Sequence, residues 1–167
     1  MGERANLSRE AALEKIRHIA EGEIAMVHTF GEHEVGVVRP MATAGVDADG
    51  TLWFMSQAGS PKNEQVLRDR VMQITYALKS RSEYLVLDGT AQLLRDRAKI
   101  DELWSAIDKT WFPGGKDDPA ITLIRFTPKI GHYWDTAHGR AAQLLGMAAG
   151  AVTGKGTDDS VEGDFRL

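Results

Sequence analysis

The spacing of hydrophobic and polar residues along the chain predicts two kinds of element, strands and helices. Short runs rich in apolar and β-branched residues, separated by Gly, Asp and Ser turns, are typical of strands. Because the first three runs follow one another with only turns between them, the pattern favours a mainly antiparallel sheet or barrel over a doubly wound parallel sheet. Strands are expected at 24–30, 34–42, 51–56, 72–79, 84–94, 121–127 and 132–134.

Apolar residues spaced three and four apart predict helices at the periphery of this sheet. Ser8 is a good N-cap for the first helix, and Gly22 supplies its end. Ser60 followed by Pro61 predicts the start of a second helix, because Pro is well suited to the first helical position. Helices are therefore expected at 9–21, 61–69, 96–107 and 139–152.

The composition is that of one ordinary globular domain, with 167 residues, 43% of them hydrophobic and 26% charged. No interior stretch of Gly, Ser and Pro divides the chain, so one domain is expected over 1–154, followed by a polar and mobile tail over 155–167. The longest nearly apolar run, 141–152, is shorter than the roughly 20 residues of a membrane-spanning helix. We expect a cytoplasmic protein that does not contact a membrane.

Charge and cysteine content exclude several classes of function. Twenty Lys and Arg against 24 Asp and Glu give a net charge of -4, which argues against a nucleic-acid-coating protein. The chain has no Cys, so disulfides, Cys-ligated zinc and thiol nucleophiles are excluded. The His residues lack the spacing of helical metal ligands, so no metal site is expected, and the acidic pairs at 117–118 and 158–159 fit a solvated surface better than acid–base chemistry.

A phosphate site is the chemistry that the sequence indicates most clearly. A helix that begins at Ser60 and Pro61 offers unpaired backbone N–H groups, and Lys62 adds a full positive charge. Arg39 lies in a valine-rich strand just before Pro40, a residue that marks a sheet edge or an irregularity. Taken singly, each feature also fits a capped helix with a solvated Lys, or a strand Arg facing solvent. Together they predict a two-cation phosphate clamp if the two elements are neighbours.

The order of short motifs along the chain resembles the general stress protein 26 group of pyridoxamine-phosphate-oxidase-like flavoproteins. The resemblance covers roughly residues 13–154, and its specificity comes from the order and spacing of motifs that are individually weak. The matching motifs are Arg39-Pro40-Met41, Leu52-Trp53-Phe54, Ser60-Pro61-Lys62, Asp96-Arg97-Ala98-Lys99-Ile100, Trp111-Phe112-Pro113-Gly114-Gly115, Tyr133-Trp134-Asp135 and Gln143-Leu144-Leu145-Gly146.

The resemblance implies a split β-barrel that forms a homodimer and binds FMN between the subunits. It implies that Arg39 and Lys62 hold the FMN phosphate and that Ser60 donates to it. The remaining implied contacts divide between one subunit and its partner. The first would contribute Met41, Ala42, Phe54, Met55 and Ser56 along the flavin, and the partner Trp111 and Trp134.

Two departures from the family pattern limit what the resemblance implies about activity. The predicted fifth strand reads Leu-Val-Leu-Asp-Gly at 85–89, where the group often has small hydroxyl residues. Residues 164–167 do not resemble the substrate-binding end of the true oxidase, so oxidation of pyridoxamine phosphate is not expected. Three functions stay open: a flavin-dependent oxidoreductase, a non-catalytic FMN-binding stress protein, and the same barrel with a deazaflavin or haem.

Overall fold

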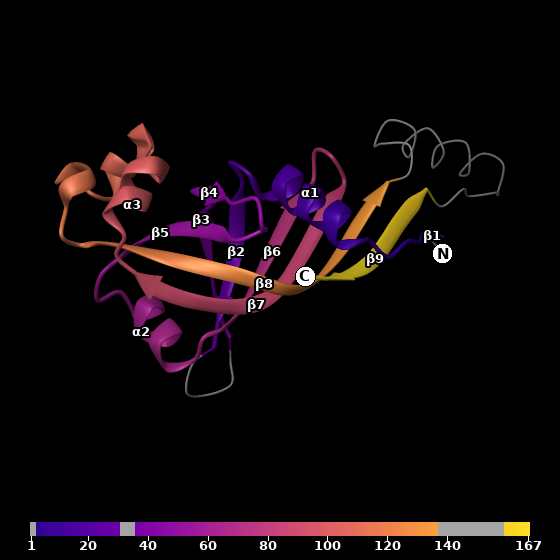
Figure 1. Ribbon diagram of the computed structural model, residues 1–167, viewed down its shortest axis with the longest axis horizontal. Helices are drawn as coiled ribbons and strands as arrows, with labels where there is room; N and C mark the ends of the chain where they lie inside the picture. The colour runs from indigo at the N-terminus through magenta and orange to yellow at the C-terminus, as the bar shows by residue number, and fades with distance from the viewer. Residues whose placement is uncertain (1–2, 31–35, 137–158) are drawn as a thin grey trace.

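The computed structural model describes residues 3–30, 36–136 and 159–167, which form a curved sheet with helices at its periphery (Figure 1). Along the sheet the strands follow the order β1-β9-β8-β7-β6-β2-β3, and β5 pairs with β4 and β8. The described strands are β1 (Glu3–Arg4), β2 (Ile24–Thr29), β3 (Val37–Ala42), β4 (Gly45–Val46), β5 (Leu52–Gln57), β6 (Val71–Leu78), β7 (Glu83–Leu94), β8 (Ile121–Thr136) and β9 (Ser160–Arg166).

Three α-helices and two short 3-10 helices are described beside these strands. The α-helices are α1 (Arg9–Ala20), α2 (Pro61–Arg68) and α3 (Arg97–Leu103), and the 3-10 helices are η1 (Ala106–Thr110) and η2 (Gly115–Asp117). The Ser8 side chain accepts a hydrogen bond from the Ala11 N–H, as its N-cap position predicts. The expected fold class, a mainly antiparallel β structure with peripheral helices, is confirmed.

β8 is long enough to pair with two different strands along one of its edges. β8 pairs with β7 along nearly its whole length, and its first half also pairs with β5. Its second half pairs instead with β9. One edge of β8 thus joins both β5 and β9 to the sheet, while its other edge stays paired with β7.

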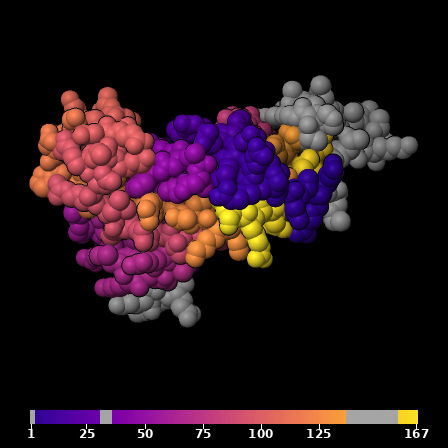
Figure 2. Space-filling model, in the orientation of Figure 1, coloured from indigo at the N-terminus to yellow at the C-terminus, as the bar shows by residue number. Residues whose placement is uncertain are grey.

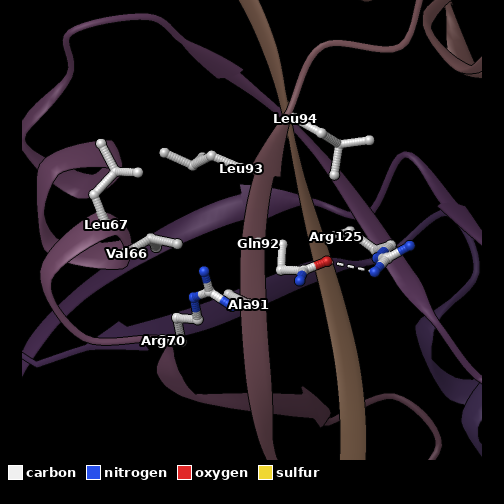
Figure 3. Close-up of a pocket in the computed structure, with 8 residues that line it drawn as sticks. All are labelled: Val66, Leu67, Arg70, Ala91, Gln92, Leu93, Leu94 and Arg125. Carbon is white, nitrogen blue, oxygen red and sulfur yellow. Dashed lines mark hydrogen bonds between the residues drawn. The ribbon is translucent and has the colours of Figure 1, made fainter.

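Two hydrophobic clusters fill the two sides of β5, because alternate side chains of a strand point to opposite faces. Leu52 and Phe54 belong to the main core together with the buried face of α1. Trp53 belongs to the second cluster, with Ile100 of α3 and Phe112 of the following loop. α2 covers the far end of β7, where Figure 3 shows Val66 and Leu67 near that strand.

Several sequence expectations are corrected by the structure. The segments at 121–127 and 132–134 are one strand, β8, because Pro128 lies at an irregularity opposite Gly89 and does not end the pairing. Only Gly fits at 89, since an added Cβ would lie 2.2 Å from the Thr127 carbonyl oxygen. The third expected helix is shorter: α3 ends at Leu103, and Ser105 then caps the 3-10 helix η1 with Asp108. The expected helix at 139–152 lies outside the described residues.

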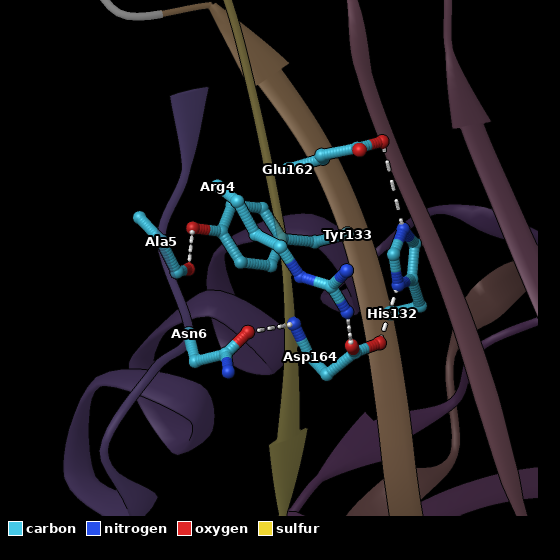
Figure 4. Close-up of polar contacts among 7 residues, drawn as sticks. All are labelled: Arg4, Ala5, Asn6, His132, Tyr133, Glu162 and Asp164. Atoms are coloured by element: carbon cyan, nitrogen blue, oxygen red, sulfur yellow. Dashed lines mark hydrogen bonds and ion pairs between the residues drawn. The ribbon is translucent and has the colours of Figure 1, made fainter. Parts of the chain in front are cut away.

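The expectation of a mobile polar tail is wrong for residues 160–166, which form β9. This strand lies between β8 and the parallel strand β1, so both ends of the described chain lie side by side, and α1 lies against β9 (Figure 2). Asp164 accepts hydrogen bonds from Arg4 at 2.6 Å and pairs with His132 at 2.5 Å (Figure 4). These contacts lower the pKa of Asp164, with the His132 hydrogen bond as the largest cause. The polar residues of β9 are thus partners within the sheet.

Because β9 packs tightly on β8, we expect one added methyl group at Gly131 to destabilise the fold. The buried Phe165 ring packs on Gly131, where an added Cβ would lie 2.1 Å from the ring. We expect Gly131→Ala to lower the free energy of unfolding by about 1–3 kcal/mol, as overpacking of a filled core does. Gly36→Ala is the control, because the nearest atom there is 3.6 Å away. Equal free energies of unfolding for the two variants, measured by urea denaturation, would contradict this packing.

Candidate functional site

A polar cluster on β2, β3 and α2 contains the Arg39 predicted from the sequence. β3 is the edge strand of the described sheet, and Arg39 lies opposite Val27 of β2. Its guanidinium donates one hydrogen bond to Thr29 Oγ1 and one to Gln65 Oε1, each at 2.8 Å. Thr29 itself donates to Gln65 Oε1 at 2.6 Å. These contacts hold the planar guanidinium in one orientation and leave its remaining N–H groups for a ligand.

Lys62 stands beside Arg39, at the start of α2. The helix begins at Pro61, and Ser60 occupies the N-cap position with extended backbone. The Lys62 ammonium donates to Ser60 Oγ at 3.3 Å. Burial lowers the pKa of Lys62 first, and the nearby charge of Arg39 lowers it further. The structure therefore brings Arg39, Ser60 and Lys62 together as the sequence predicted.

The positive charges of Arg39 and Lys62 are not balanced in the described part of the chain. Burial also lowers the pKa of Arg39, and within 3–30, 36–136 and 159–167 no carboxylate forms an ion pair with Arg39 or Lys62. Two like charges that are partly desolvated and close enough to repel each other are unfavourable without a counter-ion. A phosphate group at the start of α2 would offset both charges and also meet the positive end of the helix.

A buried amide fixes the position of α2 relative to the sheet. Asn63 accepts a hydrogen bond from Ser56 Oγ at 2.5 Å and donates to the Gln57 carbonyl at 3.0 Å and to Thr122 Oγ1 at 2.9 Å. Thr122 donates in turn to the Ser56 carbonyl. Ser56, which the resemblance implied as a residue along the flavin, thus uses its hydroxyl to anchor α2. Its backbone remains the part of Ser56 that can serve a ligand.

Other residues implied by the resemblance are spread over different surfaces. Met41 packs against the main core, whereas Ala42 is exposed and points to the opposite face of β3. Phe54 is fully buried in the main core, and Met55 packs against the second cluster. The structure therefore does not direct these side chains toward one common surface. Sequence reasoning missed Thr29, Gln65 and Asn63, because ordinary polar residues carry no motif and acquire a role only through contacts across the fold.

Trp134 lines a surface pocket, whereas Trp111 is 75% exposed in the loop after α3. The pocket has a volume of about 380 Å³, and Trp134 lies directly opposite Tyr84 across the β7–β8 ladder. The hydroxyl of Thr136, also in its lining, is buried without a hydrogen-bond partner among the described residues. The other lining residues are Ser82, Asp135 and Ser160.

This aromatic pocket and Arg39 lie on opposite faces of the sheet. Strand register aligns Arg39 with the buried side chains of Val27, Ile74 and Leu87. Tyr84 is three residues from Leu87 along β7, so its side chain points to the other face, as does that of Trp134 opposite it. One copy of the chain therefore does not bring Trp134 and Arg39 to a common face.

Comparison with known proteins identifies the family. The model of the family described as pyridoxamine 5'-phosphate oxidase like matches residues 11–158, which is most of the chain. The chain belongs to this family. A crystal structure of a protein described as a general stress protein 26 from Jannaschia sp. CCS1 superimposes with a TM-score of 0.78 at 25% identity, covering 96% of this chain and 100% of that one.

A further solved structure and a sequence relative extend the comparison. The general stress FMN/FAD binding protein of Xanthomonas citri shares the fold, with a TM-score of 0.64 and 22% identity over 76% of this chain and 89% of that one. Protein bli-3 of Neurospora crassa is 25% identical over 126 residues, which are 70% of this chain and 60% of that protein. The match thus spans less than two thirds of the fungal relative. No helix in the described part of the chain is long and apolar enough to cross a membrane.

The proximity of the two cations predicts a measurable change in the titration of Lys62. Arg39→Gln removes the charge that contributes to lowering the pKa of Lys62, so we expect that pKa to rise toward its ordinary value. Titration of isotopically labelled lysine side chains by NMR measures the change. Arg17→Gln removes an equal charge from an exposed position on α1 and is expected to leave Lys62 unaffected. An unchanged Lys62 titration in Arg39→Gln would show that the two charges do not interact.

Proposed function

We propose that this protein binds FMN and that Arg39 and Lys62 hold its 5'-phosphate. The observation that carries the proposal is the pair of partly desolvated cations at the start of α2, without a carboxylate partner among the described residues. Two positive charges match the charge of one phosphate monoester, and a planar guanidinium suits its oxygens. The name of the Xanthomonas citri relative, which describes it as FMN/FAD binding, supports a flavin as the ligand.

Neighbouring residues complete the proposed phosphate site. Ser60 Oγ accepts from Lys62, which leaves the Ser60 hydroxyl proton free to be donated to a phosphate oxygen. Gln65 and Thr29 orient Arg39, and Asn63 keeps the start of α2 in place. The proposed site is therefore formed before the ligand binds, which reduces the entropy lost on binding.

The proposed role of the bound flavin is redox chemistry. FMN supplies hydride and electron transfer through its ring system, so we propose a flavin-dependent oxidoreductase. Pyridoxamine phosphate is not proposed as the substrate, because its own phosphate would require a second cationic site beside the ring. Residues 164–167 contain one cation, Arg166, which is exposed at the end of β9, whereas Asp164 is an acid bonded to Arg4 and His132, and Phe165 is buried on Gly131. A single exposed arginine does not make the second cationic site.

We further propose that the protein is a homodimer whose partner copy completes the flavin site. Strand register places a set of exposed apolar side chains on a single outer face of β2, β3, β6, β7 and β8. Exposed apolar side chains gathered on one face are typical of an interface, and Trp134 is one of them; the hydrogen-bonded pair Gln73 and Asp88 lies on the same face. A second copy packed on this face would lie beside the edge strand β3, and we infer that its Trp134 reaches the flavin held there by the first copy. The exposed apolar side chains on this outer face are Ile24, Met26, Val38, Val71, Tyr84, Ile130 and Trp134.

Removal of either cation is expected to weaken FMN binding. A charge-assisted hydrogen bond contributes about 1.5–3 kcal/mol, so Arg39→Ala or Lys62→Ala should raise the dissociation constant roughly ten- to hundredfold. Fluorescence titration of the folded variants measures this. Riboflavin, which lacks the phosphate, should bind the native protein weakly and be little affected by either substitution. The control Lys79→Ala removes an exposed lysine elsewhere. Normal FMN affinity in both folded variants would contradict the proposed phosphate site.

Mixed dimers test whether the two parts of the site come from different copies. Lys62→Ala and Trp134→Ala should each weaken FMN binding when present in both subunits. If a site combines Lys62 of one copy with Trp134 of the other, each mixed dimer has one native site. Random pairing should then restore about a quarter of the native sites.

The two variants are co-refolded in equal amounts, and mixed dimers are isolated by two different affinity tags. Isolated dimers of either variant serve as controls and are expected to stay weak. Isolated mixed dimers without any high-affinity site would contradict the shared arrangement. A monomer with full FMN affinity, detected by sedimentation, would contradict the dimer itself.

A further inference from the structure

A pocket of about 350 Å³ lies at the end of β7, on the side of α2 formed by Val66 and Leu67 (Figure 3). The pairing of β7 with β6 ends at Thr90, which lies opposite Val71. One more hydrogen bond follows, from the Ala91 N–H to the Arg70 carbonyl at 2.7 Å. Beyond it, in the described part of the chain, the segment 92–94 pairs with β8 on one side and with no strand on the other. The pocket opens on this free edge.

The lining combines apolar walls with two arginines. Val66 and Leu67 come from α2, and Leu93 and Leu94 from β7, while Arg70 and Arg125 supply the positive charge. Arg125 donates to Gln92 Oε1, but its Nε–H is buried without a hydrogen-bond partner among the described residues. Figure 3 shows the Arg70 side chain directed toward β7 beside Ala91. The volume lies within the range of small-molecule sites.

Positive charge in this pocket is not balanced by the described residues. No ion pair is formed there by Arg70 or Arg125 with a described carboxylate. The neighbouring Asp69 accepts a hydrogen bond from the Val71 N–H at 2.9 Å, at the start of β6. In a chain of net charge -4, such a local excess of arginine indicates an anionic ligand.

The free strand edge adds a directional donor. In an antiparallel strand, alternate residues direct their N–H and C=O groups to the same edge. The Ala91 N–H points toward Arg70, so the Leu93 N–H points to the same side, into the space where no described strand follows. An arginine beside a free backbone N–H matches the two oxygens of a carboxylate.

We propose that this pocket binds a small carboxylic acid with an apolar tail. The carboxylate contacts Arg70 and the Leu93 N–H, Arg125 adds positive charge, and the tail packs on Val66 and Leu67. The site is independent of the proposed flavin function. Gln65 faces Arg39 on the other flank of α2, so the helix separates the two anion sites.

Octanoate is the probe for this site, and octanol, which has the same tail without the charge, is its control. Isothermal titration of the full-length protein is expected to show one octanoate site per chain and much weaker binding of octanol. Arg70→Gln should weaken octanoate about tenfold, as the loss of one charge-assisted hydrogen bond predicts. Leu67→Glu should weaken it similarly by repulsion, and Leu67 is exposed enough to tolerate the change. Arg17→Gln, an exposed arginine on α1, should leave it unchanged.

Four outcomes would overturn the proposal. Octanol binding as tightly as octanoate would show that the carboxylate is not recognised. Unchanged octanoate affinity in both Arg70→Gln and Leu67→Glu, or no binding at about 1 mM octanoate, would show that the pocket is not the site. Displacement of octanoate by FMN would assign it to the Arg39–Lys62 pair instead. If FMN failed to bind the native protein, the proposed function would be contradicted, but the octanoate site would not.

Discussion

The hydrogen bonds of the buried Asn63 side chain decide where both charged regions of this molecule lie. Asn63 links α2 to the end of β5 through Ser56 and Gln57, and to the start of β8 through Thr122. A buried amide is costly unless its donors and acceptor are satisfied, so these contacts hold the helix in one position. With α2 fixed, Lys62 is held on one flank beside Arg39, and Val66 is held on the other beside β7.

The Arg39–Lys62 pair shows how a fold can store an unfavourable charge arrangement for a ligand to relieve. Burial and mutual repulsion both act against the charged form of Lys62, and burial acts against that of Arg39. The fold maintains the pair because Arg39 is fastened through neutral partners, Thr29 and Gln65. A carboxylate in place of Gln65 would neutralise Arg39 and compete with any anion. Neutral partners orient the guanidinium and preserve its charge, which suits a binding site.

Local sequence signals predict correctly those elements whose start or end depends on residues nearby in the chain. Ser60 and Pro61 mark the start of α2, and Pro40 lies in the edge strand β3, as expected. The continuity of β8 through Pro128 was missed, because the irregularity that accommodates this residue is supplied by Gly89 on another strand. β9 was missed because its polar residues resemble a tail until Arg4 and His132 are placed beside Asp164. The candidate site shows the same dependence on contacts across the fold. Arg39 and Lys62 lie in recognisable motifs, whereas the residues that orient them do not.

The pairing of β1 with β9 imposes an order on how the sheet forms. Arg4 and Asp164 are separated by 160 positions, so their contact closes nearly the whole described chain into one loop. The entropy lost in such a closure has to be offset by contacts that already exist when the ends meet. The second half of β8 must therefore be held by β7 before β9 can dock, and β9 must dock before β1 has a strand to pair with. The N-terminal strand, first in the chain, is by this reasoning the last to join the sheet.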